Sequence, residues 1–243
     1  MRYLVLSDIH ANHVALAAVL EHAGAQAWDG LVFLGDAVGY GAQPEEVVQA
    51  LMRLGPAVAI CGNHELMVLK LADGHRIGGG AVAEIAARHS RELSAESLGF
   101  LRGLELEALR EGWAAVHGAL RKPWEYIISV PSARMNQPLM KRDLYFVGHT
   151  HVPMAYILSS KGGTQRWQPV SCLQAHTAIE LQAGQQAFVN PGSVGQPRDG
   201  SVLASYAIFD EASRRIEIFR IAFDHEAARA VAQARGYGQP VLR

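Results

Sequence analysis

YLVLSDIH, residues 3–10, decides the fold, because an apolar run ends directly in polar side chains. The run from Tyr3 to Leu6 predicts a short buried strand. Asp8 and His10 follow it two positions apart, and residues two apart in an extended chain share a face. Loops that follow buried strands hold the ligands of α/β proteins, so this stretch predicts a functional site at the end of a sheet.

The same change from an apolar run to polar residues recurs four times along the chain. The segments are Gly35-Asp36, Gly62-Asn63-His64-Glu65, His117-Gly118 and Gly148-His149-Thr150-His151. Glycine stands in each of them, and it permits sharp turns and close approach of the backbone. We expect all five segments to contribute to one site.

The first half of the chain alternates strands with helices. Apolar runs predict further strands over 31–34 and 57–61. Helical patterns cover 12–21, 44–54, 65–71 and 81–93, and Ser94 begins another short helix. Asn12 is placed to cap the first of these helices, and Pro44 suits a first helical turn.

The second half of the chain is rich in strands. They are predicted over 113–117, 144–147, 154–158, 177–181, 187–189, 203–209 and 216–221. No helix is expected after Trp124 and Tyr126, whereas Asp224 begins a helix that runs to Ala234 and stops at Gly236. This order predicts an α/β fold of two sheets packed face to face with helices outside, as one domain over 1–243.

Composition excludes several classes of protein. The 243 residues suit one α/β domain. Lys plus Arg total 22 and Asp plus Glu total 23, which argues against binding long nucleic acid through a basic face. Two Cys exclude a disulfide scaffold. No stretch approaches the roughly 20 apolar residues of a membrane span, and no export signal is evident, so we expect a cytoplasmic protein. The oligomeric state is left open.

Metal binding is the chemistry that the polar segments favour. Together the segments supply seven candidate metal ligands, which are two Asp, one Asn and four His: Asp8, His10, Asp36, Asn63, His117, His149 and His151. Oxygen ligands mixed with imidazole suit Mn²⁺, Fe, Zn²⁺ or Co²⁺. Seven ligands exceed the need of one tetrahedral ion and fit two ions that share a carboxylate. Two ions about 3.5–4 Å apart can clamp both oxygens of a phosphoryl displacement.

The order of these segments resembles the calcineurin-like metallophosphoesterases. That family carries D-x-H, G-D, G-N-H-[DE], a later H and G-H-x-H, and all five occur here between Asp8 and His151. Asn190-Pro191-Gly192-Ser193 and Arg198 further resemble the compact bacterial and archaeal phosphodiesterase branch. The resemblance implies a four-layer α/β/β/α sandwich with two packed mixed sheets.

Roles for individual residues follow from the same resemblance. Asp8, His10 and His151 correspond to ligands of one metal, and Asn63, His117 and His149 to ligands of the other, with Asp36 as the bridge. His64 corresponds to the histidine that gives a proton to the leaving oxygen, with Glu65 as the residue that orients it. The implied cofactor is a pair of divalent ions, with Mn²⁺ expected and Fe, Zn²⁺, Ni²⁺ or Co²⁺ as alternatives. The implied reaction is attack of a metal-bound hydroxide on a phosphoester.

Departures from the family pattern bear on the substrate. Tyr40 and Cys61 stand where the protein phosphatases of this superfamily carry arginines that grip phosphate. A small phosphodiester or nucleotide is therefore favoured, with diadenosine tetraphosphate as one specific candidate. Two alternatives are a phosphoprotein phosphatase and a non-catalytic module that binds a partner on the same scaffold. The complete ligand set favours the enzyme over the module.

Four residues are candidates for substrate contact, each with a structural alternative. They are Arg198, Tyr40, Trp124 and Asn12. Arg198 would replace the missing positive charge if its loop reaches the site. Trp124 and its neighbour Tyr126 could stack on a nucleobase, or pack under a loop. Asn12 is more simply a helix cap, and the six other histidines, His89 among them, suit surface or core positions.

Overall fold

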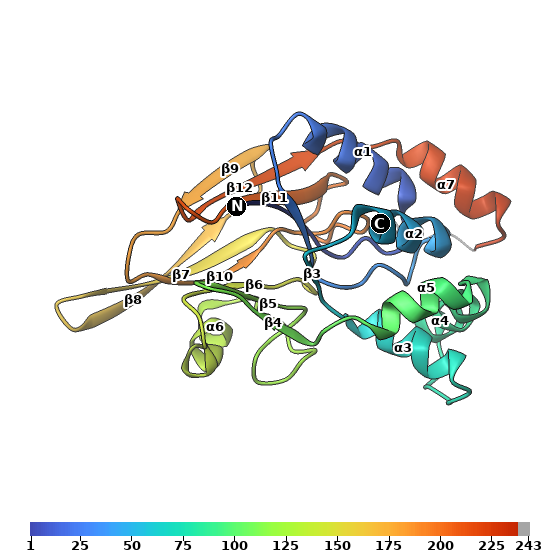
Figure 1. Cartoon of the computed structure of the whole chain (residues 1–243), viewed down its shortest axis with the longest axis horizontal. Coiled ribbons are helices and arrows are strands. Elements are labelled where there is room, and N and C mark those ends of the chain that lie inside the picture. The colour runs from blue at the N-terminus through green and yellow to red at the C-terminus, as the bar shows by residue number, and fades with distance from the viewer. Residues whose placement is uncertain (238–243) are drawn as a thin grey trace.

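Two six-stranded mixed sheets pack face to face at the centre of the molecule (Figure 1). The computed structural model describes residues 1–237, and residues 238–243 of the predicted domain lie outside the described residues. The first sheet has the order β3-β2-β1-β11-β12-β9, and the second has the order β4-β5-β6-β10-β7-β8. The second half of the chain therefore contributes to both sheets.

In the first sheet, strands from the two halves of the chain lie side by side. Its strands are β1 (Arg2–Leu6), β2 (Gly30–Phe33), β3 (Val58–Ala59), β11 (Ala204–Asp210), β12 (Arg215–Ile221) and β9 (His176–Glu180). β1, β2 and β3 are parallel, whereas β11 pairs antiparallel with β1. The carboxyl ends of the three parallel strands consequently share one edge of the sheet.

The second sheet repeats this arrangement around a second parallel group. Its strands are β4 (Glu107–Leu109), β5 (Trp113–Val116), β6 (Leu144–Phe146), β10 (Gln186–Asn190), β7 (Met154–Lys161) and β8 (Thr164–Ser171). β5, β6 and β10 are parallel to one another, and β7 and β8 form a hairpin that projects from the body (Figure 1). The loops after β5 and β6 carry His117, His149 and His151.

Alternation along the strands explains why the sheets pack on each other. Val5 and Val32 of the first sheet face Phe146 and Trp113 of the second in one buried cluster. The intervening Leu4 points to the opposite face, which the helices cover. Burying a large apolar side chain of this kind stabilises the fold by about 1.5–3 kcal/mol.

Helices form the two outer layers, and the predicted four-layer sandwich is confirmed. α1 (His13–Gly24), α2 (Pro44–Leu54) and α7 (His225–Ala234) lie over the first sheet, next to α3 (Asn63–Ala72), α4 (Ala81–Glu92) and α5 (Ala95–Arg102) (Figure 1). α6 (Val130–Asn136) and the 3₁₀ turn η1 (Gln137–Leu139) cover the second sheet. Side chains of Asn12, Ser94 and Asp224 cap α1, α5 and α7, as predicted.

One α-helix and two strands of residues 1–237 were not predicted from the sequence. The expectation of no helix after Tyr126 was wrong, because α6 begins four residues later, with Ser129 and Ser132 bonding to each other's backbone N–H groups. β8 was missed because TQRWQPVS is exposed on both faces and shows no apolar alternation. β4 was missed because it has only three residues.

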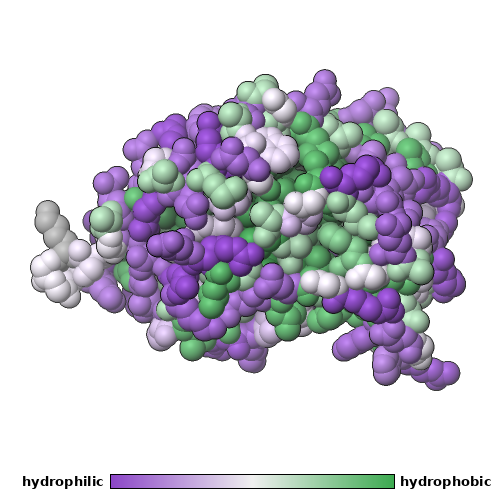
Figure 2. Space-filling view, viewed as in Figure 1, coloured by the Kyte–Doolittle hydropathy of each residue, from purple (hydrophilic) through white to green (hydrophobic). Residues whose placement is uncertain are grey.

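The surface is mixed in character. Figure 2 shows hydrophilic residues at both ends of the viewed face and apolar residues gathered toward its middle. Within residues 1–237, no helix has the length and apolar character that crossing a membrane requires.

Candidate metal centre

The loops at the shared edge of the two sheets bring the predicted ligands together. Asp8, His10 and His151 form one buried group, and Asp36, His117 and His149 form another. Within each group the candidate ligand atoms lie within 4.8 Å of one another. A third group joins His10 and Asp36 to His64, so the two centres are continuous. The aspartates and histidines that the sequence predicted as ligands of two ions are therefore adjacent.

The rings of His10 and His151 direct their Nε2 atoms inward. Nδ1 of His10 lies 2.9 Å from the carbonyl oxygen of Val38, and Nδ1 of His151 lies 2.5 Å from that of Gln196. A carbonyl oxygen only accepts, so each Nδ1 carries a proton, and in the neutral ring each Nε2 presents a lone pair. The two Nε2 atoms lie 3.1 Å apart. Two lone pairs at this distance repel each other, and a cation bound by both atoms removes the repulsion.

His117 and His149 repeat this arrangement at the second centre. Nδ1 of His117 lies 2.8 Å from the carbonyl oxygen of Leu34, and Nε2 of His149 lies 3.2 Å from that of Trp124. The remaining nitrogens, Nε2 of His117 and Nδ1 of His149, face each other at 3.2 Å. Histidine ligands commonly donate their other N–H to a carbonyl in this way, which fixes the ring and its tautomer.

Three oxygen atoms complete the fit to divalent cations. Among residues 1–237, no hydrogen-bond partner satisfies Oδ1 of Asp8, Oδ2 of Asp36 or Oδ1 of Asn63, although all three atoms are buried. A buried acceptor without a partner destabilises a fold by about 1–3 kcal/mol, and by more if it is charged. Carboxylate and amide oxygens beside inward imidazole nitrogens suit Mn²⁺, Fe, Zn²⁺ or Co²⁺.

The electrostatic environment keeps both aspartates anionic. Burial alone would raise the pKa of Asp36, but His117 and His64 hold it well below its usual range. The pKa of Asp8 is lowered in the same way, chiefly by His151. Burial lowers the pKa of His117, but the Asp36 carboxylate, 3.2 Å from its Nε2 atom, raises it to about 10, so a cation that binds Nε2 would displace a proton. The same negative charge attracts a metal cation.

The backbone at the centre is strained. The φ angles are 54° at Asp8, 50° at His10, 59° at Asp36, 67° at His149 and 61° at His151. This left-handed region costs a non-glycine residue roughly 1–2 kcal/mol. Such strain persists only where surrounding contacts fix it, and it gathers at functional sites. One such contact is the 2.9 Å bond from the N–H of His10 to the carbonyl of Asp36.

His64 lies beside the two predicted ligand groups, in the third group that it shares with His10 and Asp36. Its Nε2 atom is 4.0 Å from Oδ2 of Asp36, and its buried Nδ1 atom has no partner among the described residues. The ring packs against His10 and Tyr40 at centroid distances of 4.9 and 4.7 Å. Burial lowers the pKa of His64, although the charge of Asp36 opposes the shift.

Glu65 makes hydrogen bonds other than those that its predicted role requires. Its carboxylate accepts from the N–H groups of Asp36 at 2.7 Å, Gly62 at 2.8 Å and Val38 at 3.2 Å, rather than from the ring of His64. The idea that Glu65 orients His64 is thus replaced by a larger role, in which it joins the loops after β2 and β3. Burial and the nearby charge of Asp36 raise the pKa of Glu65 to about 7.

The loops also depend on residues that the sequence did not reveal as supports. Ser7 donates to Oδ2 of Asp8 at 2.6 Å, and Ser193 donates to the carbonyl of Asp8 at 2.7 Å. Asn190 donates to the carbonyl of Gly148 at 2.7 Å. The Asn190–Ser193 segment was noticed as a motif, but its bonds to two ligand loops arise only from the tertiary arrangement.

The four substrate-contact candidates fall into different places. Asn12 is 3% exposed, and its side-chain amide caps α1 and donates to the carbonyl of Gly195. This is the helix-cap role that the sequence offered as the alternative to substrate contact. Arg198 reaches the cluster's rim, where its guanidinium donates to the hydroxyl of Tyr40 at 3.2 Å. Tyr40 packs edge-on against His10, with centroids 4.7 Å apart. Trp124 is partly exposed, with its indole 6.1 Å from the ring of His117.

His89 was interpreted as an ordinary surface or core residue, yet it holds a loop of the site. Its Nδ1 atom accepts from the N–H of Gly39 at 3.1 Å, and its Nε2 atom donates to the carbonyl of Gly41 at 3.0 Å. These bonds fix the backbone on both sides of Tyr40. Its spacing in the sequence gives no sign of this role, because α4 is far from the loop along the chain.

Comparison with known proteins agrees with this geometry. The family model for the calcineurin-like phosphoesterase superfamily domain matches residues 1–214. An uncharacterized protein of Methanocaldococcus jannaschii is 36% identical over 231 residues, covering 92% of this chain and 88% of that protein. The crystal structure of a metallophosphoesterase from Sphaerobacter thermophilus superimposes with a TM-score of 0.84 at 33% identity, covering 98% of this chain and 96% of that chain.

A more distant structure shares the fold alone. A hypothetical protein from Pyrococcus horikoshii OT3 has a TM-score of 0.75 at 18% identity, and the match covers 99% of this chain and 96% of that chain. The overall fold is thus shared with proteins of both organisms.

Proposed function

We propose that this chain, which belongs to the calcineurin-like phosphoesterase superfamily and is a metal-dependent phosphoester hydrolase, acts on small phosphodiesters or nucleotides with two divalent ions. The observation that carries the proposal is a pair of buried carboxylate oxygens, one each from Asp8 and Asp36, that lie among imidazole nitrogens and have no hydrogen-bond partner within residues 1–237. In the proposed arrangement, Asp8, His10 and His151 hold one ion and Asn63, His117 and His149 hold the other. Asp36 is shared between them.

Two such ions supply charge neutralisation for a phosphate group and activation of water. The protein's own contribution is to hold the ligands rigidly, since each imidazole is fixed by a bond from its other nitrogen to a backbone carbonyl. Rigid placement matters because phosphoryl transfer depends mainly on positioning and electrostatic stabilisation.

His64 is the residue we assign to the leaving group. It stands beside Asp36 without being part of either ligand group, and its ring is confined by Tyr40 and His10. An imidazole at this place can give a proton to the oxygen that departs from phosphorus, which typically contributes 10²–10⁴-fold to the rate. The negative charge of a bound phosphate favours the protonated ring.

The low positive charge of the side chains around the proposed metal centre favours diesters over monoesters as substrates. Tyr40 and the buried Cys61 leave neutral side chains where protein phosphatases carry arginine. The guanidinium of Arg198 donates hydrogen bonds to the Tyr40 hydroxyl and to Oε1 of Gln196. A phosphomonoester carries a charge of about −1.5 to −2 near neutral pH, whereas a diester carries a single charge and needs fewer cations around it.

A metal-reconstituted hydrolysis panel tests the proposal. The protein is loaded with Mn²⁺, Ni²⁺, Mg²⁺ or Zn²⁺ and offered bis-p-nitrophenyl phosphate, p-nitrophenyl phosphate, diadenosine tetraphosphate and a phosphoserine peptide. We expect turnover of the diester or the dinucleotide to exceed that of the monoester and the peptide. Preference for the phosphopeptide would establish a protein phosphatase instead. No turnover with any metal would favour a binding module.

A further inference from the structure

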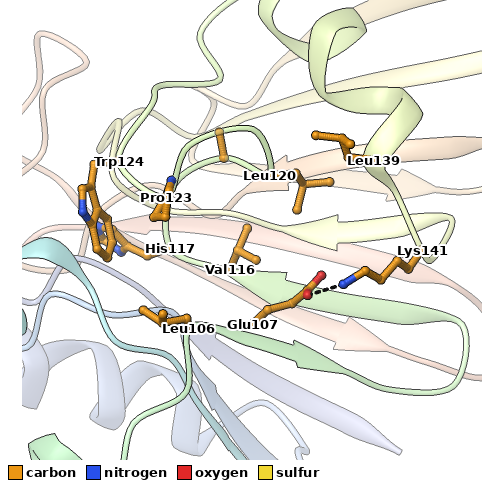
Figure 3. Close-up of a pocket in the computed structure, with 10 residues that line it drawn as sticks. Leu106, Glu107, Val116, His117, Leu120, Pro123, Trp124, Leu139 and Lys141 are labelled. Carbon is orange, nitrogen blue, oxygen red and sulfur yellow. Dashed lines mark hydrogen bonds and ion pairs between the residues drawn. The ribbon is translucent and has the colours of Figure 1, made fainter.

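A cavity of about 340 Å³ opens beside the second ligand group, on the outer face of the second sheet (Figure 3). Val116 of β5 lies at its floor, and the loop after β5 contributes Leu120 and Pro123. Leu106 and Leu139 stand at its margins with 57% and 46% of their surfaces exposed. Its volume lies at the lower end of the range for small-molecule sites, about 300–1,000 Å³, which are mostly apolar.

One end of this cavity reaches the metal centre. His117 and Trp124 both line it, and Figure 3 shows them together at that end. The carbonyl of Trp124 accepts from Nε2 of His149 at 3.2 Å, so the loop that carries the indole is tied to a second ligand. A phosphoester held at the centre can therefore extend an attached group past Trp124 into the cavity.

The other end of the cavity is polar. Nζ of Lys141 lies 2.6 Å from Oε2 of Glu107, and Figure 3 shows this ion pair across the cavity from Trp124. The hydroxyl of Tyr145 donates to Oε1 of Glu107 at 3.0 Å, which holds the carboxylate in place. An ammonium donor and a carboxylate acceptor thus stand side by side at the end of an apolar slot.

A ligand with apolar faces and a polar edge matches these walls. We propose that the cavity receives a nucleobase of the substrate, with its ring faces against Trp124 and the leucines and its edge toward Glu107 and Lys141. This inference rests on the proposed phosphodiesterase function and narrows its substrate class to nucleotide esters. Stacking of a base on an aromatic side chain is worth about 1–3 kcal/mol, or about 5- to 150-fold in binding.

Two chromogenic diesters that share the same leaving group test the inference. One is the thymidine 5′-ester of p-nitrophenyl phosphate, and the other is its tetrahydrofurfuryl counterpart, which keeps a sugar-like ring and lacks the base. We expect kcat/KM of the Mn²⁺-loaded protein to be at least about tenfold higher for the thymidine ester. Equal values would overturn the inference and leave the phosphodiesterase intact, whereas no hydrolysis of either ester would count against the phosphodiesterase itself.

Variants locate the preference within the cavity. Trp124→Ala removes the aromatic wall, and Leu139→Trp fills the space, so both should reduce the ratio of the two kcat/KM values toward one, mainly through KM. The matched control is Ile128→Ala, because Ile128 is 64% exposed nearby and does not line the cavity. It should keep the wild-type ratio. A preference for an n-octyl ester over the thymidine ester would show that the cavity takes an alkyl chain, which contradicts the inference.

A binding measurement separates the cavity from catalysis. The protein is labelled with 5-fluorotryptophan and loaded with diamagnetic Zn²⁺ in place of Mn²⁺. It is then titrated with adenosine, which has no phosphate to hydrolyse. The ¹⁹F resonance of Trp124, assigned through Trp124→Phe, should shift with adenosine and stay in place with ribose. An unmoved Trp124 resonance at saturating adenosine would overturn the inference whatever the activity results are.

Discussion

The backbone of Gly39 lies so close to the ring of His64 that a Cβ atom at residue 39 would be 2.2 Å from Nδ1 of His64. Gly39 also has a φ of 88°, in the region that favours glycine. His89 holds this backbone from the other side through the Gly39 N–H. The position of the proposed proton donor thus depends on a glycine and on a histidine from a separate helix.

Replacing Gly39 by Ala should displace His64 and lower activity. The new methyl group forces the imidazole away from Asp36, and a misplacement of about 1 Å costs on the order of 100-fold in rate. We expect kcat for the preferred diester to fall by about this factor while the metal content stays at the wild-type level. Steady-state kinetics and metal analysis of the same sample measure both quantities.

Gly55→Ala is the matched control for this variant. Gly55 also has a positive φ, of 60°, but a Cβ atom there would meet nothing within 4 Å. Both variants should lose about 1 kcal/mol of stability because alanine is strained at positive φ. An equal loss of activity in the two would show that backbone strain, rather than contact with His64, is responsible.

His89 should make the free energy of unfolding depend on pH. Burial lowers the pKa of His89 to about 4, whereas an unfolded histidine titrates near 6.5. The unfolded chain therefore binds a proton at this residue between these values and the folded chain does not. The stabilisation is complete above about pH 6.5 and decreases as the pH falls to about 4, by about 3 kcal/mol in total.

Urea unfolding of wild type and His89→Gln between pH 4 and 8 measures this contribution. Other buried histidines titrate in both proteins, so the comparison isolates residue 89. The variant should be less stable than the wild type at pH 8, and the difference between their free energies of unfolding should decrease as the pH falls. A constant difference across the range would mean that the pKa of His89 is the same in the folded and unfolded chains, which contradicts the prediction.

Glu65→Ala should destabilise the fold and loosen the loop that carries Asp36. The change leaves three backbone N–H groups without their acceptor, those of Asp36, Val38 and Gly62. Lost partners for buried donors cost about 1–3 kcal/mol each, so we expect a loss of about 3 kcal/mol or more. Glu45→Ala is the control, because Glu45 accepts from an exposed N–H of Ser94, and it should lose less than about 1 kcal/mol.

His64→Ala should separate turnover from metal binding. Because His64 is not one of the seven proposed ligands, the variant should retain its metal content while kcat falls by 10²- to about 10⁴-fold. His75→Ala changes an exposed histidine and should leave both quantities unchanged. Loss of metal in His64→Ala would place this residue among the ligands.

The sequence predicted most of the fold because buried strands and amphipathic helices leave periodic patterns. β1, β2 and β11 are apolar runs, and each was expected close to its observed bounds. The pairing of β11 with β1 was not foreseeable, since no local signal selects a partner about 200 positions away. β8 was missed because it is exposed on both faces and interacts mainly with β7.

The site shows the same division between local and tertiary information. The seven proposed ligands could be predicted because each follows a strand in a recognisable short segment. Ser7, Ser193 and His89 support those segments through contacts that exist only after folding. The prediction that Glu65 orients His64 was wrong, because His64 is only its neighbour in sequence, whereas its hydrogen-bond partners are backbone groups of two loops.

The number of metal ions that each chain binds tests the central claim most directly. Protein loaded with Mn²⁺ and freed of excess metal is analysed by plasma mass spectrometry, with turnover of bis-p-nitrophenyl phosphate followed in the same sample. We predict about two ions per chain, loss of turnover on chelation, and about one ion or fewer for Asp36→Asn, because the shared carboxylate is removed. Full turnover in the metal-free protein, or two ions still bound by Asp36→Asn, would contradict the proposed centre.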